Sequence, residues 1–189
     1  MGHRDRFDGE FGSVLAGARA GVPWAFERIF TTLSPVVEAY LRFQGAAEPE
    51  DLVSDVFLAV MRGVATFEGD ESGFRSWVFT IAHRRLIDER RRAARRPATP
   101  VTLDDAPDVR ASDDVAVTVE ETLADERVRT LCERLSPDQR DVLVLRLLGR
   151  LTVDEVAATL NRTPGSVKAL QRRGFLAIAR LIERERVSL

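Results

Sequence analysis

The chain contains 189 residues, of which 44% are hydrophobic and 31% charged, a balance typical of globular domains and unlike that of a fibrous or disordered chain. Its formal net charge is −2, yet 27 of its 28 basic residues are arginine, whose planar guanidinium suits phosphate groups and base edges. One cysteine, Cys132, and two histidines, His3 and His83, exclude a disulfide framework and a multi-cysteine zinc site.

Apolar residues recur three and four positions apart over most of the chain, and no alternating run bounded by hairpin turns appears. The predicted fold class is therefore all-α, with two small helical domains joined by a flexible linker. No apolar run approaches the roughly 18 residues that cross a bilayer. We therefore expect no membrane insertion and a reducing, cytoplasmic location.

The first predicted domain spans residues 8–96. Its helices are expected over residues 8–20, 23–44, 49–63 and 72–95, because segments containing glycine or proline separate them. Pro35 lies inside the second of these helices and is expected to kink it after Ser34.

The helix over residues 49–63 carries two aspartates on its outer side. Asp51 and Asp55, which we call the acidic ridge, are one turn apart, whereas Leu52 and Phe57 lie on the inner side. Like charges at this spacing mildly destabilise an isolated helix. The ridge is therefore either simply solvated or faces a basic partner surface.

The helix over residues 72–95 combines aromatic residues with arginines. Residues 84–96 hold seven arginines against Asp88 and Glu89. Exposed aromatic rings stack on unpaired bases and arginines hold phosphates, although an aromatic stripe at helical spacing more often belongs to a core. We expect Trp77 to be mostly buried, and His83 to face solvent or DNA with its protonation disfavoured by the neighbouring arginines.

Residues 97–119 are predicted to form an acidic, flexible linker. This segment holds three prolines and five aspartates without a sustained helical period. As a coil it would span on the order of 25 Å, and fully stretched about 70 Å, so the two domains could act on well-separated sites. The aspartates lack the glycine turn and fixed ligand spacing of an EF-hand, and we expect no metal or cofactor.

The second predicted domain spans residues 120–186, with helices over residues 120–134, 137–149, 153–160 and 164–185. Two capping boxes, Ser136 to Gln139 and Thr152 to Glu155, and a proline at position 164 fix the starts of three of them. A short helix, a three-residue turn and a longer helix form the layout of a helix-turn-helix. Such pairs also occur in bundles that touch no DNA, but 13 basic against 7 acidic residues over 127–189 favour DNA.

Taken in order, these motifs resemble those of the extracytoplasmic-function (ECF) sigma factors, small two-domain members of the bacterial sigma-70 family. The resemblance rests on Asp51-Leu52-Val53-Ser54-Asp55-Val56-Phe57, on Phe74-Arg75-Ser76-Trp77-Val78, and on Leu135-Ser136-Pro137 through Gly165-Ser166-Val167-Lys168. It implies a region 2-like domain followed by a region 4-like helix-turn-helix domain.

The resemblance also implies a function and its residues. Core RNA polymerase would bind through its β′ clamp helices and β flap, with Asp51, Leu52, Asp55 and Phe57 at the clamp contact. The −10 element would be melted and read by Phe67, Arg75, Trp77, His83, Arg84, Arg85, Asp88 and Arg91. The −35 element of promoter DNA would be read by Thr163, Ser166, Lys168, Gln171, Arg172 and Arg173. An anti-sigma factor is a further expected partner.

Two other classes of function fit the sequence less well. A decoy that only occupies core polymerase or an anti-sigma factor would not need the basic residues that face DNA. An enzyme would need a clustered carboxylate site, a nucleophile with its base, or a glycine-rich phosphate loop, and the sequence contains none of these motifs. We therefore expect a transcription initiation factor without catalytic residues.

Overall fold

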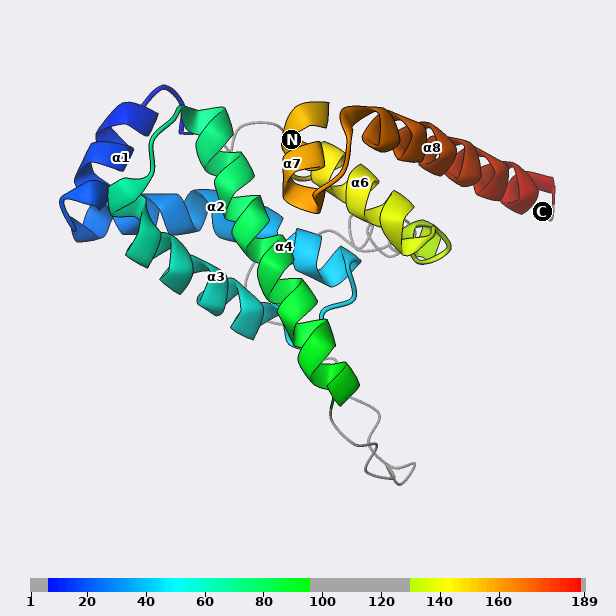
Figure 1. Ribbon diagram of the computed structural model, residues 1–189, viewed down its shortest axis with the longest axis horizontal. Coiled ribbons are helices and arrows are strands. Elements are labelled where there is room, and N and C mark those ends of the chain that lie inside the picture. The colour runs from blue at the N-terminus through cyan, green and yellow to red at the C-terminus, as the bar shows by residue number, and fades with distance from the viewer. Residues whose placement is uncertain (1–6, 96–129, 188–189) are drawn as a thin grey trace.

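The computed structural model describes residues 7–95 and 130–187, and all regular structure within these ranges is helical. Figure 1 shows two groups of helices, α1 to α4 and α6 to α8. The predicted linker over residues 97–119 lies outside the described residues, as does most of the helix predicted over residues 120–134. Among the described residues, no helix combines the length and apolarity needed to cross a membrane.

The first group contains the four predicted helices and one extra turn. Its elements are α1 (Phe11–Arg19), α2 (Pro23–Phe43), α3 (Pro49–Gly63), the 3-10 turn η1 (Val64–Thr66) and α4 (Glu71–Arg95). Proline occupies the first turn of both α2 and α3, where its missing N–H has no helical partner to lose. Pro35 does not end α2, which continues through it to Phe43.

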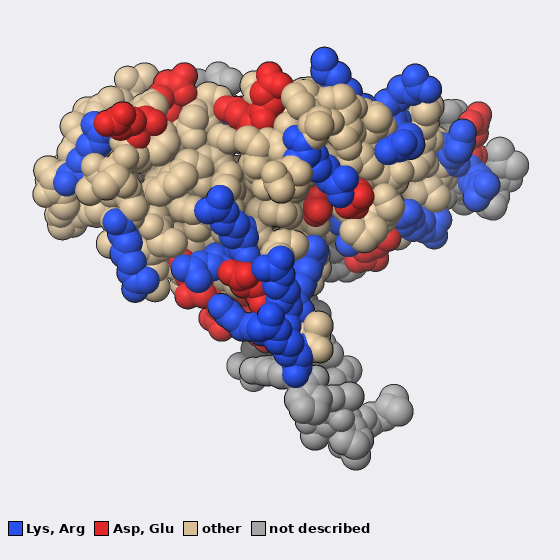
Figure 2. All heavy atoms as spheres, viewed as in Figure 1, with Lys and Arg blue, Asp and Glu red and all other residues tan. Residues whose placement is uncertain are grey.

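The second group forms the predicted helix-turn-helix. Its elements are α6 (Pro137–Leu147), α7 (Val153–Leu160) and α8 (Pro164–Val187), and both predicted capping boxes are present. Asn161 turns the chain between α7 and α8 with a left-handed backbone, φ 51° and ψ 51°. Figure 2 shows basic side chains gathered over α8 and over the end of α4 on one face of the molecule.

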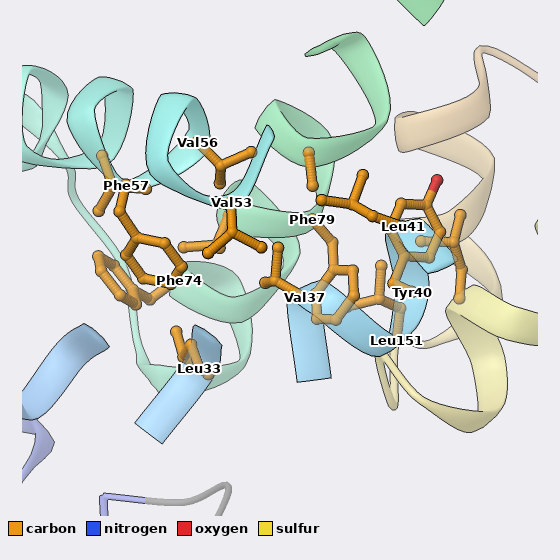
Figure 3. Packing of buried hydrophobic residues seen from close by; sticks show 14 of the residues in the cluster. Leu33, Val37, Tyr40, Leu41, Val53, Val56, Phe57, Phe74, Phe79 and Leu151 are labelled. Atoms are coloured by element: carbon orange, nitrogen blue, oxygen red, sulfur yellow. The ribbon is translucent and has the colours of Figure 1, made fainter. Parts of the chain in front are cut away.

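A single apolar cluster runs through both groups (Figure 3). In the first group, Tyr40 and Phe79 are fully buried with their rings edge to face, 5.5 Å between centroids. Leu151, from the segment between α6 and α7, belongs to the same cluster and is 1% exposed. Burying a side chain of this size contributes about 1.5–3 kcal/mol, so the two groups share part of their hydrophobic stabilisation.

Polar contacts join the two groups along α4 and α7. The Ser72 hydroxyl donates to Glu155 Oε1 over 2.9 Å, and the Thr80 and Thr159 hydroxyl oxygens are 3.0 Å apart. Helix α6 also contacts α2. The arrangement therefore places the helix-turn-helix directly against the side of α4.

Candidate nucleic-acid and polymerase interface

The acidic ridge stands on the outer face of α3. Asp51 and Asp55 are exposed, as the helical spacing predicts, and Asp51 lies in the first turn, where the helix dipole favours a carboxylate. Leu52 and Phe57 are 6% and 5% exposed. Leu52 and Phe57 therefore fix the helix from inside, and contact of the four residues with a partner remains a prediction.

An apolar groove that the sequence analysis missed lies near the C-terminal half of α3. It holds about 250 Å³ between α2 and α3 and is lined mainly by Phe26, Ile29, Phe30, Phe57, Val60 and Met61. Two of the lining side chains remain largely exposed, Phe30 (44%) and Met61 (48%). Leu58, 48% exposed, follows Asp55 by three residues and therefore lies on the same face of α3 as the ridge. This spacing is the sequence signal that predicts an apolar residue on the ridge face.

The loop formed by residues 64–70 connects α3 to α4. Its Phe67 ring packs against Phe74 at 5.1 Å and against Trp77 at 5.3 Å between centroids. Asp70 caps α4, since its Oδ1 accepts a hydrogen bond of 2.8 Å from the Gly73 N–H. A guanidinium N–H of Arg19, from the end of α1, donates to the Phe67 carbonyl oxygen.

The predicted DNA-contacting residues of α4 divide into exposed and buried groups. Arg84 and Arg91 are exposed, Arg85, Asp88 and Trp77 are partly buried, and an ion pair of 3.7 Å joins Arg91 to Asp88. Arg75 is only 9% exposed, because it lies on the side of α4 that packs into the core. A contact between Arg75 and DNA remains a prediction, for a side chain that is buried in this structure.

His83 is partly buried, with one ring nitrogen facing inward, and its contact with DNA remains a prediction. Its Nδ1 lies 2.9 Å from the Tyr40 hydroxyl, within hydrogen-bond distance. Burial and, second, the Arg90 guanidinium lower the pKa of His83 from 6.5 to about 4. Protonation is disfavoured as the sequence predicted, although burial contributes more than the arginines do.

The second group contributes a carboxylate close to this site. Asp141 on α6 is partly buried, and its Oδ1 has no hydrogen-bond partner. Burial raises its pKa, while the charge of Arg90 on α4 acts in the opposite direction. Charged groups of both helix groups therefore meet near His83.

Helix α8 presents the predicted reading residues on its outer face. Thr163, Lys168, Arg172 and Arg173 are exposed and Ser166 and Gln171 partly so. Val167 and Leu170 are buried and hold the opposite face of the helix. The Thr163 hydroxyl accepts from the Ser166 N–H over 3.2 Å, which caps the start of α8.

The helix-turn-helix geometry is fixed by further contacts beneath this face. Arg162, in the turn, forms an ion pair of 2.7 Å with Asp138 at the start of α6. A Cβ at Gly174 would lie 2.7 Å from Leu143 Cδ1, so only glycine allows α8 to approach α6 this closely. The exposed face of α8 is therefore held in position by close packing between α8 and α6.

Side chains that bind metal ions are not grouped in the part of the chain described. Within residues 7–95 and 130–187 there is no group of three or more His, Cys, Asp or Glu side chains that could hold a metal ion. Cys132 is buried, and burial raises its pKa, which disfavours the reactive thiolate.

Comparison with known proteins identifies the family. Residues 29–96 match the family model for Sigma-70 region 2, and residues 125–184 match that for Sigma-70 region 4. The chain is 30% identical over 159 residues to the ECF RNA polymerase sigma factor RpoE of Cereibacter sphaeroides, covering 83% of this chain and 84% of that protein. The chain belongs to the ECF sigma factors.

Other members of this family cover different shares of their own length. The ECF sigma factor BldN of Streptomyces coelicolor is 32% identical over 172 residues, which is 89% of this chain but only 64% of BldN. SigD of Mycobacterium tuberculosis is 28% identical over 86% of this chain and 79% of SigD. The chain thus spans just under two thirds of BldN.

Solved structures of other proteins share the fold. CnrH, solved in complex with the cytosolic domain of CnrY, superposes with a TM-score of 0.65 at 22% identity, covering 92% of this chain and 97% of that one. The sigma factor RpoE of Bartonella quintana, solved in complex with the anti-sigma factor NepR, gives 0.64 at 18% identity, covering 84% and 96%. The predicted two-domain helical fold and the resemblance to ECF sigma factors are confirmed.

Proposed function

We propose that this ECF sigma factor is a promoter-specificity subunit that works in the cytoplasm and has no catalytic chemistry of its own. It binds core RNA polymerase, recognises the −35 and −10 elements and promotes promoter melting. The observation that carries the proposal is the pair of region 2 and region 4 matches, each with a basic surface on an exposed helix.

Region 4 reads the −35 element in this proposal. The exposed residues of α8 are the hydrogen-bonding types that read base edges and hold phosphates. Lys168, Arg172 and Arg173 supply positive charge, while Ser166 and Gln171 supply polar groups in the first turns. A recognition helix places its N-terminal residues in the major groove in this way.

Region 2 binds polymerase and the −10 element. The acidic ridge and the exposed Leu58, three residues after Asp55, form a mixed surface on α3 that suits a partially basic helical partner such as the β′ clamp helices. Loop 64–70 and the exposed arginines of α4 receive the unpaired −10 strand. Stacking on aromatic rings offsets the few kcal/mol needed to unstack a base.

An anti-sigma factor is the proposed regulatory partner. The similar fold of RpoE of Bartonella quintana was solved with its anti-sigma factor, which supports such a partner for this chain.

Run-off transcription on fragmented DNA of the source bacterium tests the function. Core polymerase with this protein should produce defined start sites that core polymerase alone does not produce, and the aligned start sites would give both promoter elements. Tight core binding without new start sites would instead indicate a decoy. The absence of any core binding would overturn the proposal.

A further inference from the structure

Helix α1 lies outside the segment that matches region 2, yet it contacts the proposed −10 loop. The family match begins at residue 29, whereas α1 spans Phe11–Arg19 and packs against η1. Arg19, the last residue of α1, donates a guanidinium hydrogen bond to the Phe67 carbonyl oxygen, 48 residues away in sequence. A segment outside the matched region therefore fixes the backbone of this loop.

Arg19 and Asp70 hold different parts of this loop. Phe67 has an extended backbone, φ −69° and ψ 131°, immediately after the 3-10 turn, so its carbonyl is not part of a helix. Two residues later Gly69 has φ +148°, and a Cβ there would lie 3.0 Å from the Phe67 ring. Beyond Gly69, Asp70 fixes the start of α4. Arg19 thus holds the middle of the loop and Asp70 its end.

The N-terminal segment also contacts the start of α4. The Phe7 and Phe11 rings lie 6.4 Å and 5.5 Å from the Phe74 ring, and the Phe7 N–H donates to Glu71 Oε1 over 3.4 Å. Phe74 in turn contacts the Phe67 ring. The N-terminal segment therefore supports both the backbone and the aromatic ring of residue 67.

We propose that Arg19 is a positioning residue for strand capture, which sets loop 64–70 in the conformation that receives an unpaired base of the −10 strand. This inference rests on the proposed function. A loop that is already ordered before binding loses less conformational entropy when the strand enters, so the affinity for single-stranded DNA rises. Arg19 acts through the Phe67 carbonyl and need not touch the DNA.

The first test measures loop position without DNA. Trp77 packs against Phe67, so its fluorescence, isolated in a Trp24→Phe background, reports whether the loop covers it. Arg19→Ala should increase quenching of Trp77 by acrylamide, and Arg19→Lys should give an intermediate value because it retains a donor. Arg28→Ala is the matched control: Arg28 pairs with Asp8 and Glu10, both at 3.8 Å, instead of with the loop.

The second test measures strand capture by the holoenzyme. The probe is a labelled single-stranded oligonucleotide carrying the −10 element mapped by run-off transcription. Arg19→Ala should weaken its binding about 5- to 10-fold, within the range expected for losing one hydrogen bond at an exposed position. Core affinity and the binding of −35 duplexes should not change, and Arg28→Ala should match the wild type.

The outcomes separate this inference from the proposed function. Unchanged Trp77 quenching in Arg19→Ala, or increased quenching with unchanged oligonucleotide affinity, would overturn the role of Arg19. Equal losses in Arg19→Ala and Arg28→Ala would show an effect of net charge and overturn it as well. If the wild-type holoenzyme itself does not bind the oligonucleotide, the proposed −10 function and strand capture are both wrong. The quenching result then still decides whether Arg19 orders the loop.

Discussion

At the scale of single residues, Gly63 controls the position of Trp77. A Cβ at Gly63 would lie 2.8 Å from Trp77 Cζ2, closer than real contacts allow. Gly63→Ala should therefore destabilise the fold by about 1–3 kcal/mol through overpacking, measured by urea unfolding. Gly12→Ala is the control, because a Cβ at Gly12 in α1 would meet no atom within 4 Å, and this variant should be neutral or stabilising by up to about 1 kcal/mol. Equal free energies of unfolding for the two variants would show that a Cβ at residue 63 does not clash with Trp77.

Hydrogen bonds between residues close in sequence could be predicted, whereas the burial of a side chain by a helix far away in the sequence could not. The capping hydrogen bonds of Ser136 and Thr152 depend on residues three positions away, and both were predicted. The inward position of His83 depends on Tyr40, 43 residues away, and the burial of Arg75 depends on how α4 packs. No local spacing encodes either fact.

At the scale of elements, α3 offers the clearest test of polymerase binding. Asp51→Arg with Asp55→Arg should weaken core affinity at least about 30-fold, because two favourable charge contacts become repulsive. The double variant Asp51→Asn with Asp55→Asn is the matched control, because it removes the two negative charges without reversing them. It should weaken core affinity less than the Arg pair does. Fluorescence titration of core polymerase measures the affinity, and circular dichroism checks the fold. Unchanged affinity of the Arg pair would remove the ridge from the interface.

Helix positions were predictable because the residues at their boundaries are strong signals. Which face of each helix is covered and which is exposed was less predictable. The helices over residues 49–63 and 153–160 begin and end where the sequence predicts, at proline, a capping box and the left-handed Asn161. The groove beside Phe30 and Met61 was missed because apolar residues at helical spacing are typical of a core. Whether such a residue is covered depends on the neighbouring helix.

At the scale of the whole molecule, the packing of the two helix groups was not predictable. A linker long enough to separate them permits many arrangements, and only the structure shows Thr80 against Thr159 and Leu151 within the first group's core. Because α7 lies against α4, the two helices that we propose read DNA, α4 and α8, belong to one packed unit here.

The titratable groups His83 and Asp141 make the stability of the fold depend on pH. The pKa of His83 is lowered to about 4 in the fold, against 6.5, so its contribution is complete above pH 6.5 and is lost as the pH falls toward 4. Asp141 has a raised pKa, so protonation at low pH relieves its burial and acts in the opposite direction.

The His83 effect can be isolated by comparison with a variant that does not titrate. Between pH 7.5 and pH 5 the wild type should lose about 1–2 kcal/mol more unfolding free energy than His83→Gln, which retains a polar partner for Tyr40. Urea unfolding at both pH values measures this loss for each protein. Because both proteins share all other titrating groups, the effects of those groups cancel when the two losses are subtracted. Equal losses in the two proteins would show that His83 is as readily protonated in the fold as in the unfolded chain, contrary to its burial between α2 and α4.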